Sequence, residues 1–257
     1  MSPRQERNYG IIIIILVLGI FLIASKVSYG ADIVMLSFDG NGGHDKDDYG
    51  ALPVAAALLD NTGVCWHVDY NSHVPNTNTA MIQQMRTSAN GSRQRFNVTT
   101  NWYDHSPGNM ASVINTLSST QKAKILVGGP FEMAWRALSA SNKSKHQYVT
   151  LWTHSGWNNN HEHSGTHTLR EIRNAFPTVK VQQIADQNQN LRTRLTRWNW
   201  ARDSQNEEHR FLYARIKASQ KFSRGQQDAD VSDAGLTMAA VYGNFRATPE
   251  DIRAIIE

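Results

Sequence analysis

An acidic, glycine-rich segment at residues 39–48 has the residue types and the spacing for metal chemistry. It offers five side chains with oxygen donors within ten residues: Asp39, Asn41, Asp45, Asp47 and Asp48. Because Ca²⁺ binds about 6–8 oxygen ligands in proteins, this density of carboxylate and amide groups is typical of a calcium site. The alternative is a solvated loop in which Asp47 or Asp48 only caps the helix that follows.

Two other kinds of site do not fit this segment. An EF-hand needs a glutamate that closes the loop at its twelfth position, whereas a helix starts too early here. A phosphate cradle needs Gly-Lys-Ser/Thr, and the four carboxylates of the segment would repel a phosphate group. The pattern therefore favours a cation.

A histidine-rich stretch is the second chemical signal. His154 lies between Trp152 and Trp157, whose aromatic faces could stack on a sugar or a base. We expect His154 to protonate a leaving group and the two tryptophans to bind substrate. His161 and His163 could instead hold zinc with one more ligand, although the stretch lacks the His-Glu-x-x-His of zinc proteases. A polar surface loop is the third interpretation.

Strands and helices must alternate along the chain to position these side chains. Apolar runs of strand length occur at residues 33–38, 64–68, 96–102, 124–127, 148–152 and 179–184. Helices are expected at residues 47–59, 81–86, 110–117, 131–138, 169–175, 207–218 and 249–256. The alternation predicts an α/β fold with an open, mostly parallel sheet and helices on both faces. The acidic segment then follows the first strand, at the edge where such sheets bind ligands.

A family resemblance appears along the same elements. The first strand, the Asp-rich loop, the pair Asp47 and Asp48, and the Ala- and Leu-rich helix resemble the nucleoside hydrolases (inosine/uridine-preferring). Three later motifs follow in the family's order: residues 125–134, 148–156 and 230–235. They look like a strand with a Gly-Pro turn, a strand with its substrate loop, and a late aspartate. The chain is most similar to nucleoside-hydrolase-like domains of secreted bacterial proteins, some linked to polysaccharide use.

The resemblance implies hydrolysis of an N-glycosidic bond at a calcium site that activates water. The metal ligands that it implies are Asp39, Asp48, Asp233 and the main-chain carbonyl of Val127. Asp39 would also be the general base, with Asp45 as its rival because the loop spacing differs from that of the family. The side chains of Asn41 and Asp47 would contact the substrate.

A second function stays open beside the hydrolase. The chain could be a non-catalytic domain of the same fold that binds a carbohydrate or a partner. In the family the late aspartate usually follows a histidine, and here Asp233 follows Ser232. In either case we expect a small nucleoside or glycoside ligand, and the sequence leaves a homo-oligomer open.

Charge and cysteine content exclude other classes. The net charge of +4 is mild and spread along the chain, so it does not indicate nucleic acid. The single cysteine, Cys65, excludes an intramolecular disulfide and a Cys-rich zinc module, and its place in an expected strand predicts a buried side chain. Arg192, Arg194 and Arg197 form a basic face that could bind an anionic polymer, with an ordinary surface helix as the default.

Residues 1–30 have the order of a secretory signal. Arg4 and Arg7 precede an apolar run of 13 residues, and Ser28 and Gly30 then offer small residues for cleavage. The run is shorter than the about 20 apolar residues of a membrane span. We therefore expect one domain at residues 31–257 in the periplasm or outside the cell, with an uncleaved membrane anchor as the alternative.

Overall fold

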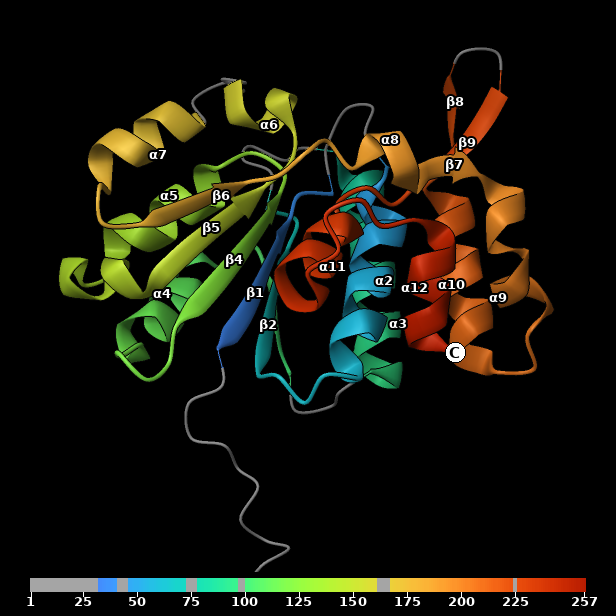
Figure 1. The fold of residues 1–257 in the computed structure, drawn as a ribbon, viewed down its shortest axis with the longest axis horizontal. Helices are drawn as coiled ribbons and strands as arrows, with labels where there is room; N and C mark the ends of the chain where they lie inside the picture. The colour runs from blue at the N-terminus through green and yellow to red at the C-terminus, as the bar shows by residue number, and fades with distance from the viewer. Residues whose placement is uncertain (1–31, 41–45, 73–77, 97–99, 161–166, 224–225) are drawn as a thin grey trace, which may run out of the picture. The chain divides into compact units, whose positions relative to one another are not determined.

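A six-stranded parallel sheet forms the centre of the fold (Figure 1). Residues 32–40, 46–72, 78–96, 100–160, 167–223 and 226–257 are described in the computed structural model. The strands are β1 (Ile33–Phe38), β2 (Trp66–Tyr70), β3 (Asn101–Asp104), β4 (Ala123–Gly128), β5 (Val149–Thr153) and β6 (Lys180–Gln183). They follow the order β3-β2-β1-β4-β5-β6, and every neighbouring pair is parallel. This confirms the predicted α/β fold with an open, mostly parallel sheet.

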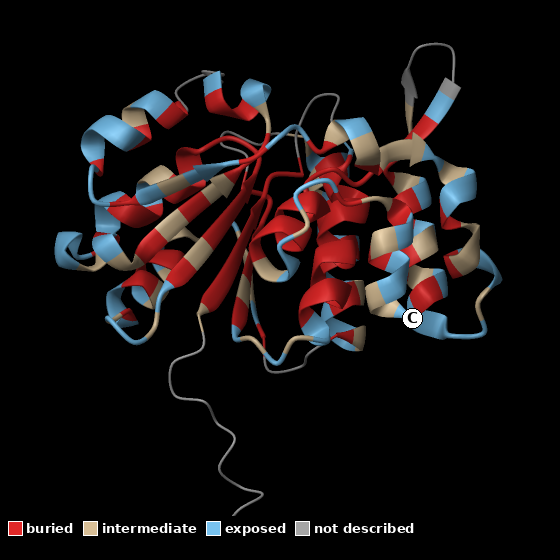
Figure 2. Ribbon diagram, in the orientation of Figure 1, coloured by how far each residue is buried: buried red, intermediate tan, exposed pale blue. Residues whose placement is uncertain are grey.

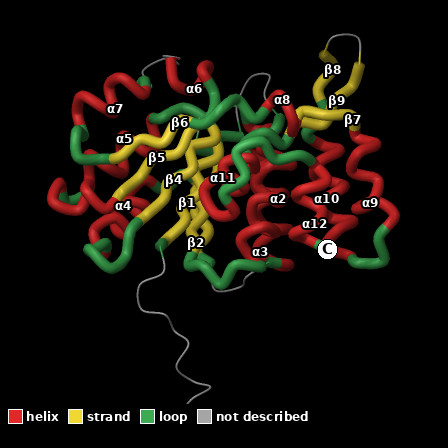
Figure 3. The backbone as a smooth tube through the Cα atoms, viewed as in Figure 1, coloured by secondary structure: helices red, strands yellow, loops and turns green. Residues whose placement is uncertain are grey.

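Helices cover both faces of this sheet (Figure 3). The larger ones are α2 (Asp48–Asp60), α3 (Thr79–Arg95), α4 (Pro107–Thr116), α5 (Glu132–Ala140), α7 (Leu169–Ala175), α10 (Glu207–Ala218), α11 (Ala234–Tyr242) and α12 (Pro249–Ile256). Successive strand residues point to opposite faces. In β1, Val34 and Leu36 therefore pack with α2, α3, α10, α11 and α12, whereas Ile33 and Met35 pack with α4, α5 and α7. The central strands are accordingly buried along their length (Figure 2).

Helix α2 positions two of the candidate residues and is almost wholly buried. Asp47 caps its start by accepting a hydrogen bond of 3.0 Å from the Asp48 N–H. Pro53 has no N–H for the Tyr49 carbonyl, and the Ser88 hydroxyl donates to that carbonyl instead, at 2.8 Å. The helix therefore accommodates its proline and presents Asp47 and Asp48 at the carboxyl edge of the sheet.

A second, smaller sheet was not predicted. Its antiparallel strands are β7 (Arg192–Arg194), β8 (Lys221–Ser223) and β9 (Gln226–Asp230), in the order β7-β9-β8. Arg192 lies opposite Asp230 in this sheet. The shorter helices are α6 (Gly156–Asn160), α8 (Asn188–Leu191), α9 (Asn199–Asp203) and the 3-10 helices η1 (Lys143–Tyr148) and η2 (Leu195–Trp198).

Some element bounds differ from those expected. The prediction of a buried Cys65 is wrong, because its side chain is exposed. The chain leaves the turn after α2 and enters the sheet only at Trp66, so Cys65 precedes β2. Phe96 ends α3 as its C-cap residue, so β3 starts later than the apolar run suggested.

The N-terminal segment lies outside the described residues. The expected secretory signal at residues 1–30 therefore stays a prediction. Among the residues that the structure describes, no helix is long and apolar enough to cross a membrane. Asp32–Glu257 forms one compact unit.

Candidate functional site

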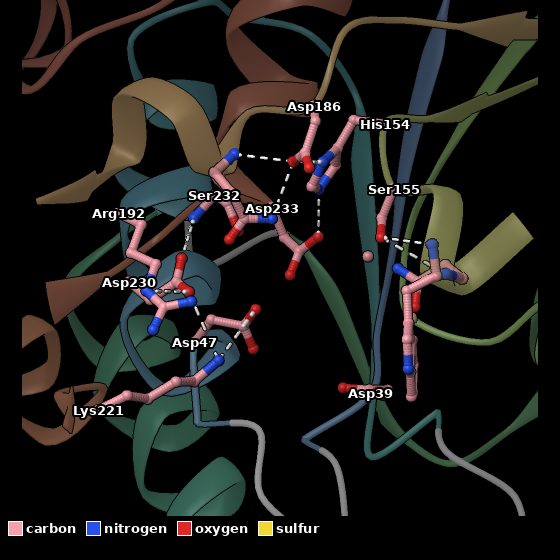
Figure 4. A pocket seen from close by; sticks show the side chains of 15 residues that line it. Asp39, Asp47, His154, Ser155, Asp186, Arg192, Lys221, Asp230, Ser232 and Asp233 are labelled. Carbon is pink, nitrogen blue, oxygen red and sulfur yellow. Dashed lines mark hydrogen bonds and ion pairs between the residues drawn. The ribbon is translucent and has the colours of Figure 1, made fainter. Parts of the chain in front are cut away.

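A cavity of about 380 Å³ opens at the carboxyl ends of the central strands (Figure 4). The order of strands reverses between β1 and β4, since β2 and β3 continue to one side and β5 and β6 to the other. Open α/β sheets bind ligands at such a switch point. Asp39 directly follows β1, and Gly128 and Gly129 stand at the end of β4; all three line the cavity. Five aspartates are among its lining residues: Asp39, Asp47, Asp186, Asp230 and Asp233.

Three carboxylates converge beside this cavity, and two of them, those of Asp47 and Asp233, line it. Asp47 and Asp48 come from the start of α2, and Asp233 precedes α11, yet one oxygen of each lies within 4.8 Å of the others. Asp48 is fixed because its Oδ2 accepts the N–H groups of Asp39 at 2.7 Å and Gly40 at 3.1 Å. Its Oδ1 is buried and accepts no hydrogen bond from the described residues. A cation in the cluster would give this oxygen a partner.

Burial and mutual repulsion perturb the cluster. Burial raises the pKa of Asp47 well above its usual value, and the charges of Asp233 and Asp230 raise it further. The pKa of Asp48 is likewise raised by burial first, then by the charge of Asp233, the charge of Asp39 and a hydrogen bond with the Asp39 side chain. Ionising these carboxylates together is unfavourable without a compensating positive charge. The donor set therefore fits a hard cation, which prefers oxygen ligands.

Asp39 lies deep in the cavity wall and is only 4% exposed. Gly129 is necessary for this position, since a Cβ there would lie 2.5 Å from the Cβ of Asp39. Gly40 follows with a φ of +55°, a conformation that glycine adopts without strain. The turn after β1 thus brings Asp39 against the end of β4.

His154 holds Asp233 in place. Its Nε2 lies 2.7 Å from Asp233 Oδ1, and its Nδ1 lies 3.5 Å from Asp186 Oδ1 and 3.3 Å from the Gln187 main-chain nitrogen. Burial lowers the pKa of His154, but the hydrogen bonds and charges of Asp186 and Asp233 raise it to about 9. Both ring nitrogens contact the protein. This arrangement suits positioning of Asp233 better than the expected donation of a proton to a leaving group.

The small sheet adds two cations that sequence reasoning did not assign to the site. Lys221 Nζ lies 3.8 Å from Asp47 Oδ2 and 3.5 Å from Asp230 Oδ2. Arg192 Nε lies 4.0 Å from the same Asp230 oxygen. Asp186, which also lines the cavity, was not predicted from the sequence. Its position shortly after the end of β6 could have indicated this, as the position of Asp39 after β1 did.

The remaining expected residues fall in different places. Trp157 lines the cavity and is 40% exposed, as a stacking platform requires. Trp152 instead stacks on Phe245 at 6.4 Å and packs against the core. Val127 is fully buried in β4. Among the described residues, Gly128 and Gly129 line the cavity and Val127 does not. Asn41, Asp45, His161 and His163 lie outside the described residues.

Comparison with known proteins gives two likenesses. No family model matches the chain. It is 28% identical over 228 residues to an uncharacterized protein P22 of Formosa agariphila, covering 80% of this chain and 81% of that protein. A solved structure of an inosine-guanosine nucleoside hydrolase is similar with a TM-score of 0.46 and 10% identity, over 82% of this chain and 79% of that one. Neither likeness assigns a reaction to this chain.

Proposed function

We propose that this chain is a Ca²⁺-dependent hydrolase of an N-glycosidic, nucleoside-type bond. The observation that carries the proposal is the convergence of three buried carboxylates, Asp47, Asp48 and Asp233. The first and the last of them line a cavity of about 380 Å³. That volume is within the range of small-molecule sites, about 300–1,000 Å³. A bound calcium ion would lower the pKa of a water molecule and hold sugar hydroxyls.

The residues of the cluster and of the cavity would divide the work between metal binding, proton transfer and substrate contact. Asp48, fixed by two main-chain N–H groups, and Asp233, fixed by His154, would be metal ligands. Asp39 would accept the proton of the attacking water as that water adds to the anomeric carbon and the bond to the leaving base breaks. Asp47 would accept a hydrogen bond from a sugar hydroxyl. Trp157 would stack on the base.

The choice of calcium rests on the donor atoms. Among the described residues, the cluster that could hold an ion consists of aspartates alone. Zinc sites typically use histidine or cysteine ligands. Here His154 contacts Asp233 but is not itself a member of the cluster, so the cluster does not resemble a zinc site. Carboxylate oxygens without nitrogen or sulfur ligands suit calcium or magnesium, and a cluster that needs several carboxylates together suits calcium.

The expected location completes the proposal. Residues 1–30 would direct the chain out of the cytoplasm, and residues 31–257 would form the mature domain in the periplasm or outside the cell. Mass spectrometry of the protein recovered from its producing cells tests this. A mature N-terminus near residue 31 is expected, and a retained N-terminus would favour the membrane anchor instead.

One observation favours the second candidate function, a non-catalytic binding domain. The ammonium of Lys221 lies 3.8 Å from Asp47 and already supplies part of the positive charge that the carboxylates need. If that charge were sufficient, the cavity could bind a sugar without an ion and without hydrolysis. Calcium binding and sugar release, measured together, therefore decide between the two functions.

The test combines calcium titration with a substrate screen. Calorimetry should show calcium binding to the wild-type protein, and reducing-sugar assays over nucleosides and oligosaccharides should show release that a chelator abolishes. Asp233→Asn keeps the acceptor for His154 but loses the charge, so both signals should fall. Glu208→Gln is the control, because Glu208 is an exposed carboxylate at the start of α10. Calcium binding with no release from any substrate would favour the binding domain, and full turnover of Asp233→Asn would refute the metal site.

A further inference from the structure

We infer that the substrate carries an anionic group on its sugar, a carboxylate, a sulfate or a phosphate, and that Arg192 and Lys221 bind it. This rests on the proposed function and names the substrate class for the same cavity. Both residues line the cavity, and both come from the small sheet, Arg192 from β7 and Lys221 from β8. In Figure 4 they lie on the opposite side of Asp233 from Ser155.

The cavity therefore has two chemically different walls. On one side, the Ser155 hydroxyl accepts the N–H groups of Trp157 at 3.2 Å and Asn158 at 3.5 Å, so an aromatic face and an amide stand together at the start of α6. On the other side stand the guanidinium and the ammonium. A sugar held between them would place its leaving group against Trp157 and another substituent toward Arg192.

The guanidinium of Arg192 is poised for an anion. Its only close carboxylate among the described residues is Asp230, with Nε 4.0 Å from Oδ2, which is longer than the roughly 2.7–2.9 Å of a charge-assisted hydrogen bond. The side chain is 31% exposed and borders the cavity. A guanidinium presents a rigid fork of N–H donors that matches carboxylate, sulfate and phosphate oxygens in pairs. The hydroxyls of a neutral glycoside can also accept these hydrogen bonds, but only an anionic group adds the attraction of opposite charges.

The place of Lys221 supports the same conclusion. Its Nζ is 3.8 Å from Asp47 and 3.5 Å from Asp230, so it lies between the carboxylate cluster and the wall that holds Arg192. With a divalent cation in the cluster, an ammonium at this distance is repelled by a like charge. An anionic substituent beside Lys221 would offset that repulsion. The cation, the Asp47 carboxylate, the Lys221 ammonium and the anionic substituent then alternate in sign across the cavity.

A purely structural role makes a different prediction. If Arg192 and Lys221 only balanced the charge of Asp230 and Asp47, removing one of them would change stability and calcium affinity, but it would not change which sugar is preferred. The discriminating quantity is therefore the ratio of affinities for an anionic sugar and its neutral counterpart, measured on the same variant.

The test uses calorimetry of the calcium-loaded full chain with matched pairs of sugars. Glucuronate and glucose test a carboxylate, glucose 6-sulfate and glucose test a sulfate, and ribose 5-phosphate and ribose test a phosphate. The wild-type protein should prefer at least one anionic member by about tenfold or more, the scale of one hydrogen bond to a charged group. Arg192→Gln should bring that ratio near one. Arg194→Gln, which removes the same charge from an exposed position of β7, should leave it unchanged.

The outcomes separate this inference from the proposed function. Equal binding of anionic and neutral sugars by the wild-type protein, or an unchanged ratio in Arg192→Gln, overturns the inference. Hydrolysis can be followed in parallel with inosine and inosine 5′-monophosphate. Turnover of the neutral compound without any anionic preference leaves the hydrolase standing and removes the anion site. An anionic preference that depends on Arg192, with no turnover of either compound, supports the anion site while the hydrolase fails.

Discussion

Replacing Asp48 by asparagine should stabilise the calcium-free protein and remove most of its response to calcium. Burial, then the charges of Asp233 and Asp39, raise the pKa of Asp48 above its value in the unfolded chain. A carboxyl group with a raised folded pKa destabilises the fold as it ionises, so its cost is absent in acid and grows as the pH rises. Asparagine keeps an oxygen for the N–H groups of Asp39 and Gly40 but has no charge.

The size of the calcium response follows from mass action. A ligand that binds only the folded state stabilises it by about 2.7 kcal/mol when its free concentration is about 100-fold above Kd. For a unit of the size of Asp32–Glu257, each kcal/mol moves the Tm by roughly 2–4 °C, so calcium should raise the wild-type Tm by roughly 5–11 °C. Without the Asp48 charge the cluster keeps two of its three carboxylates. Its response should then fall to a few °C or less.

Scanning calorimetry measures both effects. Wild type, Asp48→Asn and the control Glu208→Gln are heated at about pH 8, where the carboxylates of the unfolded chain are ionised, once with a chelator and once with calcium. We expect Asp48→Asn to melt higher than wild type in the chelator and to respond less to calcium, with Glu208→Gln resembling wild type. The reasoning is refuted if calcium leaves the wild-type Tm unchanged, or if Asp48→Asn responds as strongly as wild type.

Three further predictions concern other buried residues. His154→Gln should weaken calcium binding by about 10–100-fold in calorimetric titration, because it loosens Asp233; unchanged affinity would remove the positioning role. Burial raises the pKa of Asp69 to about 7, so ionisation costs stability as the pH rises toward 7. In urea unfolding, the stability gain of Asp69→Asn over wild type should therefore grow by about 2 kcal/mol between about pH 5 and pH 8, and a gain independent of pH would contradict this. Gly129→Ala should lower the free energy of unfolding by about 1–3 kcal/mol and weaken calcium binding, because its Cβ would press on Asp39. Gly108→Ala, whose Cβ would meet open space, is the control, and equal effects of the two would show that crowding is not the cause.

Local sequence patterns predict β1 and several helices at their observed bounds, and they place other strands, such as β3, less accurately. Helices α7, α10 and α12 have the predicted bounds, and β1 matches its apolar run residue for residue. These elements are encoded locally, because burial on one face of a helix or on both faces of a strand leaves a periodic or continuous apolar pattern. The position of the acidic segment after β1 follows from the same pattern, since the turn must lie at the carboxyl edge of a parallel sheet.

Long-range packing completes the site. The approach of Asp233 to Asp47 and Asp48 depends on the packing of α11 beside α2, which no local pattern specifies. The small sheet left no apolar alternation to detect, because β7 consists of Arg-Thr-Arg and β9 starts with polar residues. Its strands are held by pairing with one another, and that pairing brings Arg192 and Lys221 to the cavity. Long-range packing, not residue type, therefore fixes which charges face the candidate metal cluster.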